Sequence, residues 1–139
     1  MVADAELTVT TNLLGPIRMT ASLLPFLMTK PQATVLNVSS SLAFVPMAII
    51  PTYCASKAAL HSYTQSLRYQ LRKTSIQVIE ITPPGVQTKL RGDRARDPTA
   101  MPLDEFIAET MSILKNSPDA TITRWEKRRV QALAKLARC

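Results

Sequence analysis

TVLNV, residues 34–38, is a short run that is apolar on both sides except at Asn37, which is typical of a strand buried in a parallel sheet. A helix follows from Thr52, a plausible start signal, to Arg72, and IQVIEI at residues 76–81 predicts a second strand. Strand, helix and strand within about 50 residues form a βαβ unit. We therefore expect an α/β fold with a parallel sheet. The helical stripe expected to face this sheet comprises Tyr53, Lys57, Leu60, Thr64, Leu67 and Leu71.

Further elements flank this unit. Residues 5–29 repeat apolar side chains at the helical period, which predicts a helix. Pro16 predicts a kink in it over residues 12–16, because proline lacks the backbone N–H that a helix interior needs. Residues 103–114 predict another helix, and residues 120–123 could form a short edge strand. The stretch between, residues 91–102, is typical of a loop.

The composition excludes several classes of protein. The chain has 139 residues, of which 46% are hydrophobic and 19% charged, as in an ordinary soluble domain. No apolar run is long enough to span a membrane and no leader pattern opens the chain, so we expect a cytoplasmic protein. Two distant cysteines and one histidine predict no metal site. Three scattered glycines form no phosphate-cradling loop.

Most of the net charge of +7 lies near the C-terminus. Residues 124–139 hold six basic side chains and one acidic one, and we expect them to form a basic helix or tail after a domain at residues 1–123. Such a segment could bind nucleic acid or an anionic membrane surface, or could pack as a solvated helix against the body. We favour the packed helix and expect no nucleic-acid partner, because Trp125 is the only aromatic side chain of residues 124–139 that could stack on bases.

Three polar side chains should meet at one rim of the sheet. In a parallel βαβ unit the first strand ends where the crossover helix begins, so Ser40 should lie near Tyr53 and Lys57. The second strand ends at the same rim, followed by residues 84–88. Ligands of open α/β sheets bind along this edge.

These residue types suit proton exchange at a carbonyl or alcohol. The phenol of Tyr53 is a poor acid at neutral pH, but an ammonium one helical turn away at about 5 Å would stabilise the phenolate by ~3 kcal/mol. Ser40 could donate a hydrogen bond to the substrate oxygen. The hydride would have to come from a cofactor. Other polar groups have simpler interpretations: His61 is expected at the boundary of the stripe and Cys54 as a small buried residue.

The sequence resembles the short-chain dehydrogenase/reductase family. The resemblance rests on VLNVSSS at residues 35–41, YCASK at residues 53–57 and PGVQT at residues 84–88, with TNLLGP at residues 11–16 as a further match. It implies that Tyr53 is the catalytic acid or base, that Ser40 stabilises the substrate oxygen, and that Lys57 modifies the pKa of the tyrosine and binds the nicotinamide ribose. Asn12 would support a proton-relay water, and Val86 and Thr88 would contact the nicotinamide carboxamide.

The resemblance also predicts how the chain is organised. It corresponds to the C-terminal half of the family's domain, a truncated Rossmann-like sheet that lacks the N-terminal cofactor-binding half, because only 11 residues precede Asn12. The implied cofactor is NADP(H) or NAD(H), and the implied substrate is a small carbonyl or secondary alcohol. In the family, helices matching residues 4–30 and 52–73 form an oligomer interface. Two hypotheses follow: an NAD(P)-dependent oxidoreductase, and a truncated, non-catalytic relative that acts through helix-mediated association.

Overall fold

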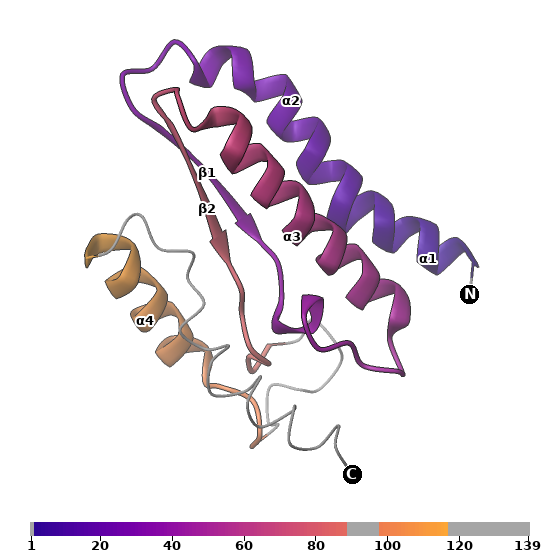
Figure 1. Cartoon of the computed structure of the whole chain (residues 1–139). Helices are drawn as coiled ribbons and strands as arrows, with labels where there is room; N and C mark the ends of the chain where they lie inside the picture. The colour runs from indigo at the N-terminus through magenta and orange to yellow at the C-terminus, as the bar shows by residue number, and fades with distance from the viewer. Residues whose placement is uncertain (1, 89–97, 117–139) are drawn as a thin grey trace.

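The computed structural model describes residues 2–88 and 98–116, and these form an α/β arrangement around a two-stranded parallel sheet (Figure 1). The elements in chain order are α1 (Val2–Val9), η1 (Thr10–Leu14), α2 (Gly15–Leu27), β1 (Ala33–Val38), η2 (Ser41–Ala43), α3 (Pro51–Leu71), β2 (Ile76–Ile81) and α4 (Leu103–Asn116). Strand β1 pairs with β2 over six residues, from Ala33 opposite Ile76 to Val38 opposite Ile81. The expected βαβ unit is confirmed.

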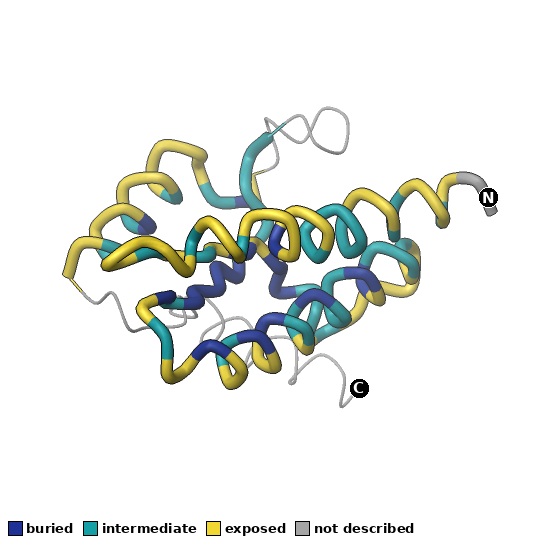
Figure 2. The backbone as a smooth tube through the Cα atoms, turned by 90° about the horizontal axis from the view of Figure 1, so that it is seen from above, coloured by how far each residue is buried: buried dark blue, intermediate teal, exposed yellow. Residues whose placement is uncertain are grey.

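Helix α3 packs on one face of the sheet. Its Leu67 and Leu71 meet Ile76 and Val78 of β2 in a buried cluster, which Leu24 and Leu27 of α2 complete. Burying such aliphatic side chains contributes about 1.5–3 kcal/mol each, so this cluster is a large part of the fold's stability. In Figure 2 the buried positions gather around this interface, whereas the helical segment that starts at the N-terminus is drawn mostly as exposed or intermediate.

Helix α4 covers the other face of β2. Ile79 and Ile81 alternate with the residues that face α3, and they contact Phe106, Ile113 and Leu114 of α4. The matching face of β1 differs from the expectation of a fully buried strand, because Leu36 and Val38 are 40% and 45% exposed. The reason is that, within the described part of the chain, α4 lies over β2 and not over β1.

The long N-terminal helix is irregular where proline predicts it. Residues Thr10–Leu14 form a π-helical turn in which Gly15 N–H donates to the carbonyl of Thr10, and Pro16 then enters the first turn of α2. A proline ring collides with the preceding turn of an α-helix and offers no amide, and the wider π turn accommodates both effects.

Helix α3 begins one residue earlier than the expected Thr52. Pro51 occupies the start of the helix, and no side chain caps it. Proline is favoured there because its fixed φ is helical and its missing N–H would have no partner anyway. The short edge strand expected at residues 120–123, the tail at residues 124–139 and most of the loop at residues 91–102 lie outside the described residues. No helix in the described ranges is long and apolar enough to cross a membrane.

Candidate active site

The carboxyl ends of both strands are tied together beyond the sheet itself. Ser39 N–H donates to Ile81 O at 2.8 Å, and Ser41 N–H donates to Pro83 O at 3.0 Å. The hydroxyl of Ser39 also lies 3.3 Å from that of Thr82, and both residues are buried. These hydrogen bonds on both sides of Ser40 fix its backbone at the carboxyl end of the sheet.

Ser40 links the end of β1 to the 3₁₀ turn η2. Its backbone is extended, at φ −165° and ψ 153°, and its Oγ accepts a hydrogen bond from Leu42 N–H at 3.1 Å. A hydroxyl has one donor and two acceptor sites, so this cap uses an acceptor and leaves the O–H able to donate. The cap fixes Oγ while keeping its proton available to a bound oxygen.

Lys57 reaches back across the rim to β1. Its Nζ donates to the carbonyl of Val38 at 2.8 Å and lies 5.8 Å from the centroid of the Tyr53 ring, one helical turn earlier on α3. Burial lowers the pKa of Lys57 from its usual 10.5, because a partly desolvated ammonium is less stable than a hydrated one. An ammonium carries three N–H donors, and the Val38 bond uses one of them.

One cavity of about 410 Å³ joins these groups. Its wall includes Ser40, Tyr53 and Lys57, together with Val86 and Thr88 from the segment after β2. The structure therefore brings five of the six residues singled out from the sequence to a single cavity. On its remaining sides the wall is mostly apolar, formed by residues after η2 and by Leu103 and Phe106 of α4.

Val86 is held in a strand-like conformation by one bridge. Met101 N–H donates to Gly85 O and Gln87 N–H donates to Met101 O, both at 2.8 Å. Because backbone groups alternate in direction along an extended segment, the N–H and C=O of Val86 point away from Met101. One donor and one acceptor are thus presented side by side by a residue of the cavity wall.

Asn12, the sixth residue, is not part of the wall. It lies in the π turn η1, and its Nδ2 donates to Ser56 Oγ at 3.1 Å. The Ser56 hydroxyl in turn donates to the backbone carbonyl of Tyr53 at 2.8 Å. Asn12 therefore touches the site through the helix that carries Tyr53, and its own amide does not line the cavity.

Sequence reasoning missed a buried acid next to this site. Glu80 of β2 has no exposed surface, and its two carboxylate oxygens lie 3.0 Å and 2.9 Å from Nδ1 of His61 on α3. His61 also meets Phe44, just after η2, edge to face at 4.5 Å between ring centroids. A glutamate in a strand whose other residues are apolar except Gln77, with one histidine on the facing helix, is the signal that could have found this pair.

Comparisons with known proteins identify the family of the chain. A family model described as short chain dehydrogenase matches residues 2–99. The uncharacterized oxidoreductase DltE of Bacillus subtilis is 49% identical over 86 residues, which are 62% of this chain and 34% of that protein. The NADPH-dependent 1-acyldihydroxyacetone phosphate reductase of Schizosaccharomyces pombe is 37% identical over 90 residues, 65% of this chain and 30% of that protein.

Solved structures show the same fold. A short chain dehydrogenase from Burkholderia cenocepacia, in complex with NADP, superimposes with a TM-score of 0.75 at 23% identity, over 94% of this chain and 54% of that one. The chain thus spans about half the length of this solved structure and about a third of the two relatives named above. No group of three or more potential metal ligands occurs among residues 2–88 and 98–116.

Proposed function

Because the chain belongs to the short-chain dehydrogenase family, we propose that it contributes the catalytic face of an NAD(P)-dependent oxidoreductase that interconverts a carbonyl and a secondary alcohol. One observation carries this proposal: Ser40, Tyr53 and Lys57 line the same cavity at the carboxyl edge of a parallel sheet. The alignment with the relatives adds that oxidoreductases share this part of the chain.

Ser40 and Tyr53 handle the substrate oxygen. The capped hydroxyl of Ser40 donates to the oxygen and holds the carbonyl against the phenol of Tyr53. Tyr53 then gives its proton to the oxygen during reduction, or takes the alcohol proton during oxidation. The Nζ of Lys57 lies one helical turn from Tyr53, 5.8 Å from the ring centroid, and adds a cationic group to this side of the site.

The residues present fit a nicotinamide. The parallel N–H and C=O of Val86 match the acceptor and donor of a primary carboxamide, with Thr88 beside them on the wall. Lys57 has two N–H donors beyond its bond to Val38 with which to hold ribose hydroxyls. Bound there, NADP(H) or NAD(H) would supply or accept the hydride.

Asn12 supports a water through its backbone. In an α-helix the Asn12 carbonyl would accept from the amide four residues later, and Pro16 has no amide proton. Asn12 lies in the π turn and its carbonyl lacks this α-helical donor, so a water is the donor that we propose for it, while the side chain fixes the π turn against Ser56. We assign Asn12 to proton relay, as a positioning residue.

Cofactor titration tests this proposal directly. The full chain is titrated with NADPH and with NADH while the cofactor fluorescence is recorded, and saturable binding is expected. No binding at high micromolar cofactor would contradict the proposal. Where turnover of a carbonyl is then found, Tyr53→Phe should abolish it, whereas Tyr63→Phe, a matched change on α3 at a residue of the core cluster, should retain it.

A second candidate is association without catalysis. Met19, Leu23 and Phe26 follow the i, i+4, i+7 spacing of one helix face of α2 and are 65%, 48% and 58% exposed. This apolar stripe favours a homo-oligomer through the helices at residues 4–30 and 52–73. Light scattering of the full chain measures its mass, and a monomer would remove this candidate.

A further inference from the structure

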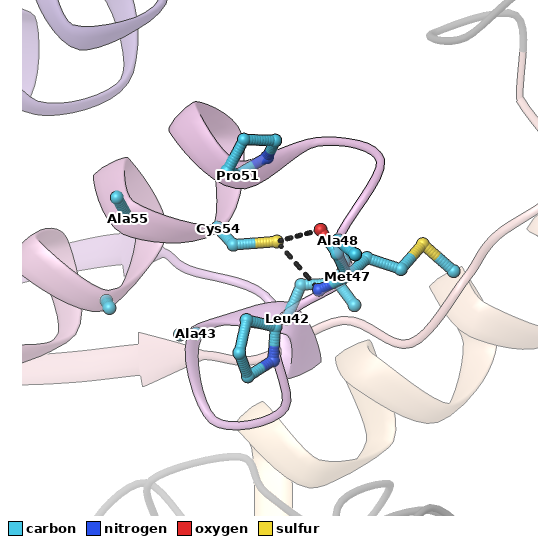
Figure 3. A pocket seen from close by; sticks show the side chains of 9 residues that line it. Leu42, Ala43, Met47, Ala48, Pro51, Cys54 and Ala55 are labelled. Carbon is cyan, nitrogen blue, oxygen red and sulfur yellow. Dashed lines mark hydrogen bonds between the residues drawn. The ribbon is translucent and has the colours of Figure 1, made fainter.

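A second cavity, widely open to solvent, lies beside the catalytic one, and it is apolar. It has a volume of about 420 Å³ and lies between the segment after η2 and the first turns of α3 (Figure 3). None of the side chains that line it carries nitrogen or oxygen, and the two with a heteroatom are Met47 and Cys54, each with a sulfur. The binding free energy at such a wall comes mainly from apolar ligand surface that is removed from water.

The thiol of Cys54 already has hydrogen-bond partners within the protein. Met47 N–H donates to its Sγ at 3.3 Å, and Sγ lies 3.9 Å from Met47 O, to which it donates (Figure 3). Cys54 is 3% exposed, so its hydrogen-bonding capacity is met by this loop. The cavity is therefore chemically a hydrocarbon site.

The two cavities share part of their walls. Leu42, Pro46 and Met47 line both of them. These three residues therefore lie between the space next to Ser40 and Tyr53 and the second cavity. Methionine suits such a junction, because its unbranched thioether adapts to the shape of what lies against it.

We propose that the substrate of the catalytic cavity carries an unbranched aliphatic chain that extends over Leu42, Pro46 and Met47 into the second cavity. The inference rests on the proposed function for the position of the reacting carbonyl. It adds the substrate class: an aliphatic ketone or the matching secondary alcohol.

Binding of a homologous series tests the proposal without needing turnover. Unbranched methyl ketones of increasing chain length are titrated into the full chain, with ligand-observed NMR as readout. Each methylene that enters the second cavity should lower the dissociation constant about fourfold, which corresponds to about 0.8 kcal/mol per buried methylene. Affinity independent of chain length, or no binding at any length, overturns the proposal.

Filling the second cavity should remove this dependence. Ala55 is an exposed residue of its wall, so Ala55→Phe places a ring there without disturbing the core. The variant should bind the shortest ketone like the unchanged chain and gain nothing from longer ones. Ala48→Phe, on the loop side of the same wall, provides a second filling variant if the first fails to fold.

Two controls separate this inference from other outcomes. Ser62→Phe adds the same ring to an exposed position of α3 outside both cavities, and it should keep the full chain-length dependence. If it behaves like Ala55→Phe, the proposal is wrong. Tyr53→Phe should keep the dependence even where turnover is lost, so failure of the proposed reaction and failure of the aliphatic site give different results. If light scattering shows a dimer that Ala55→Phe converts to a monomer and that ketones leave intact, a second copy of the chain occupies the cavity and the proposal is also overturned.

Discussion

Replacing His61 by alanine removes the partner of a fully buried carboxylate. Both oxygens of Glu80 lie within 3.0 Å of His61 Nδ1, and Glu80 has no exposed surface. Removing one partner of a buried hydrogen bond costs roughly 1–3 kcal/mol, because the remaining group stays desolvated without a partner. Both oxygens of the fully buried Glu80 lie against His61, whose side chain is 23% exposed, and we expect the upper end, about 3 kcal/mol.

Urea denaturation followed by circular dichroism measures this loss. With a slope of about 2 kcal/mol per molar, the midpoint should fall by about 1.5 M. The double variant His61→Ala with Glu80→Leu has no buried carboxyl group without a partner, so it should be more stable than His61→Ala alone. Together with the single Glu80→Leu variant this completes a cycle, for which we expect a coupling free energy of about 2 kcal/mol. A coupling below about 0.5 kcal/mol would refute the assignment of a stabilising pair.

Three further outcomes follow from the described contacts. Burial lowers the pKa of Lys57 in the folded chain, so the unfolded chain binds that proton more tightly. The free energy of unfolding should therefore rise, relative to Lys57→Met, as the pH increases from the lowered pKa toward 10.5. Denaturation at several alkaline pH values measures this, and a pH-independent difference between the two chains would contradict it. Thr64→Val should lower the free energy of unfolding by about 1–3 kcal/mol, because it leaves the buried Asn37 amide without the acceptor now 2.9 Å away. Asn12→Ala removes the partly buried bond to Ser56 and should cost about 1 kcal/mol in the same assay, with an unchanged midpoint counting against that bond.

The βαβ unit could be predicted from the sequence because its signals are local. Residues 34–38 and 76–81 read as strands, and the stripe on the helix between them does face the sheet: Leu60, Leu67 and Leu71 are buried. The exact start of α3 could not be fixed, because Pro51 and Thr52 are both acceptable first residues and only the path of the preceding loop selects between them.

The site was predictable where topology alone determines it. Ser40, Tyr53 and Lys57 had to meet at the carboxyl edge once the strands were parallel, and the cavity there contains all three. The partner of Lys57 was not predictable, because its bond to Val38 O depends on a side-chain path and not on helical spacing. The Glu80 pair with His61 was missed for a similar reason: it depends on which strand positions face α3, and that follows from the pairing of two segments distant in the chain.

The six-residue alignment of β1 with β2 has a consequence for how precisely this chain must assemble. Ser39, Ser40 and Ser41 follow β1, and Val86 and Thr88 follow β2. The register of the two strands, from Ala33 opposite Ile76 to Val38 opposite Ile81, fixes the carboxyl ends of β1 and β2 relative to each other. Sliding one strand by a single position would displace the two halves of the cavity wall by about 3.3 Å and turn Glu80 toward the opposite side of the sheet. This register thus fixes the relative position of the two halves of the wall, and the loss of the His61 contact of Glu80 would disfavour a shift by one residue.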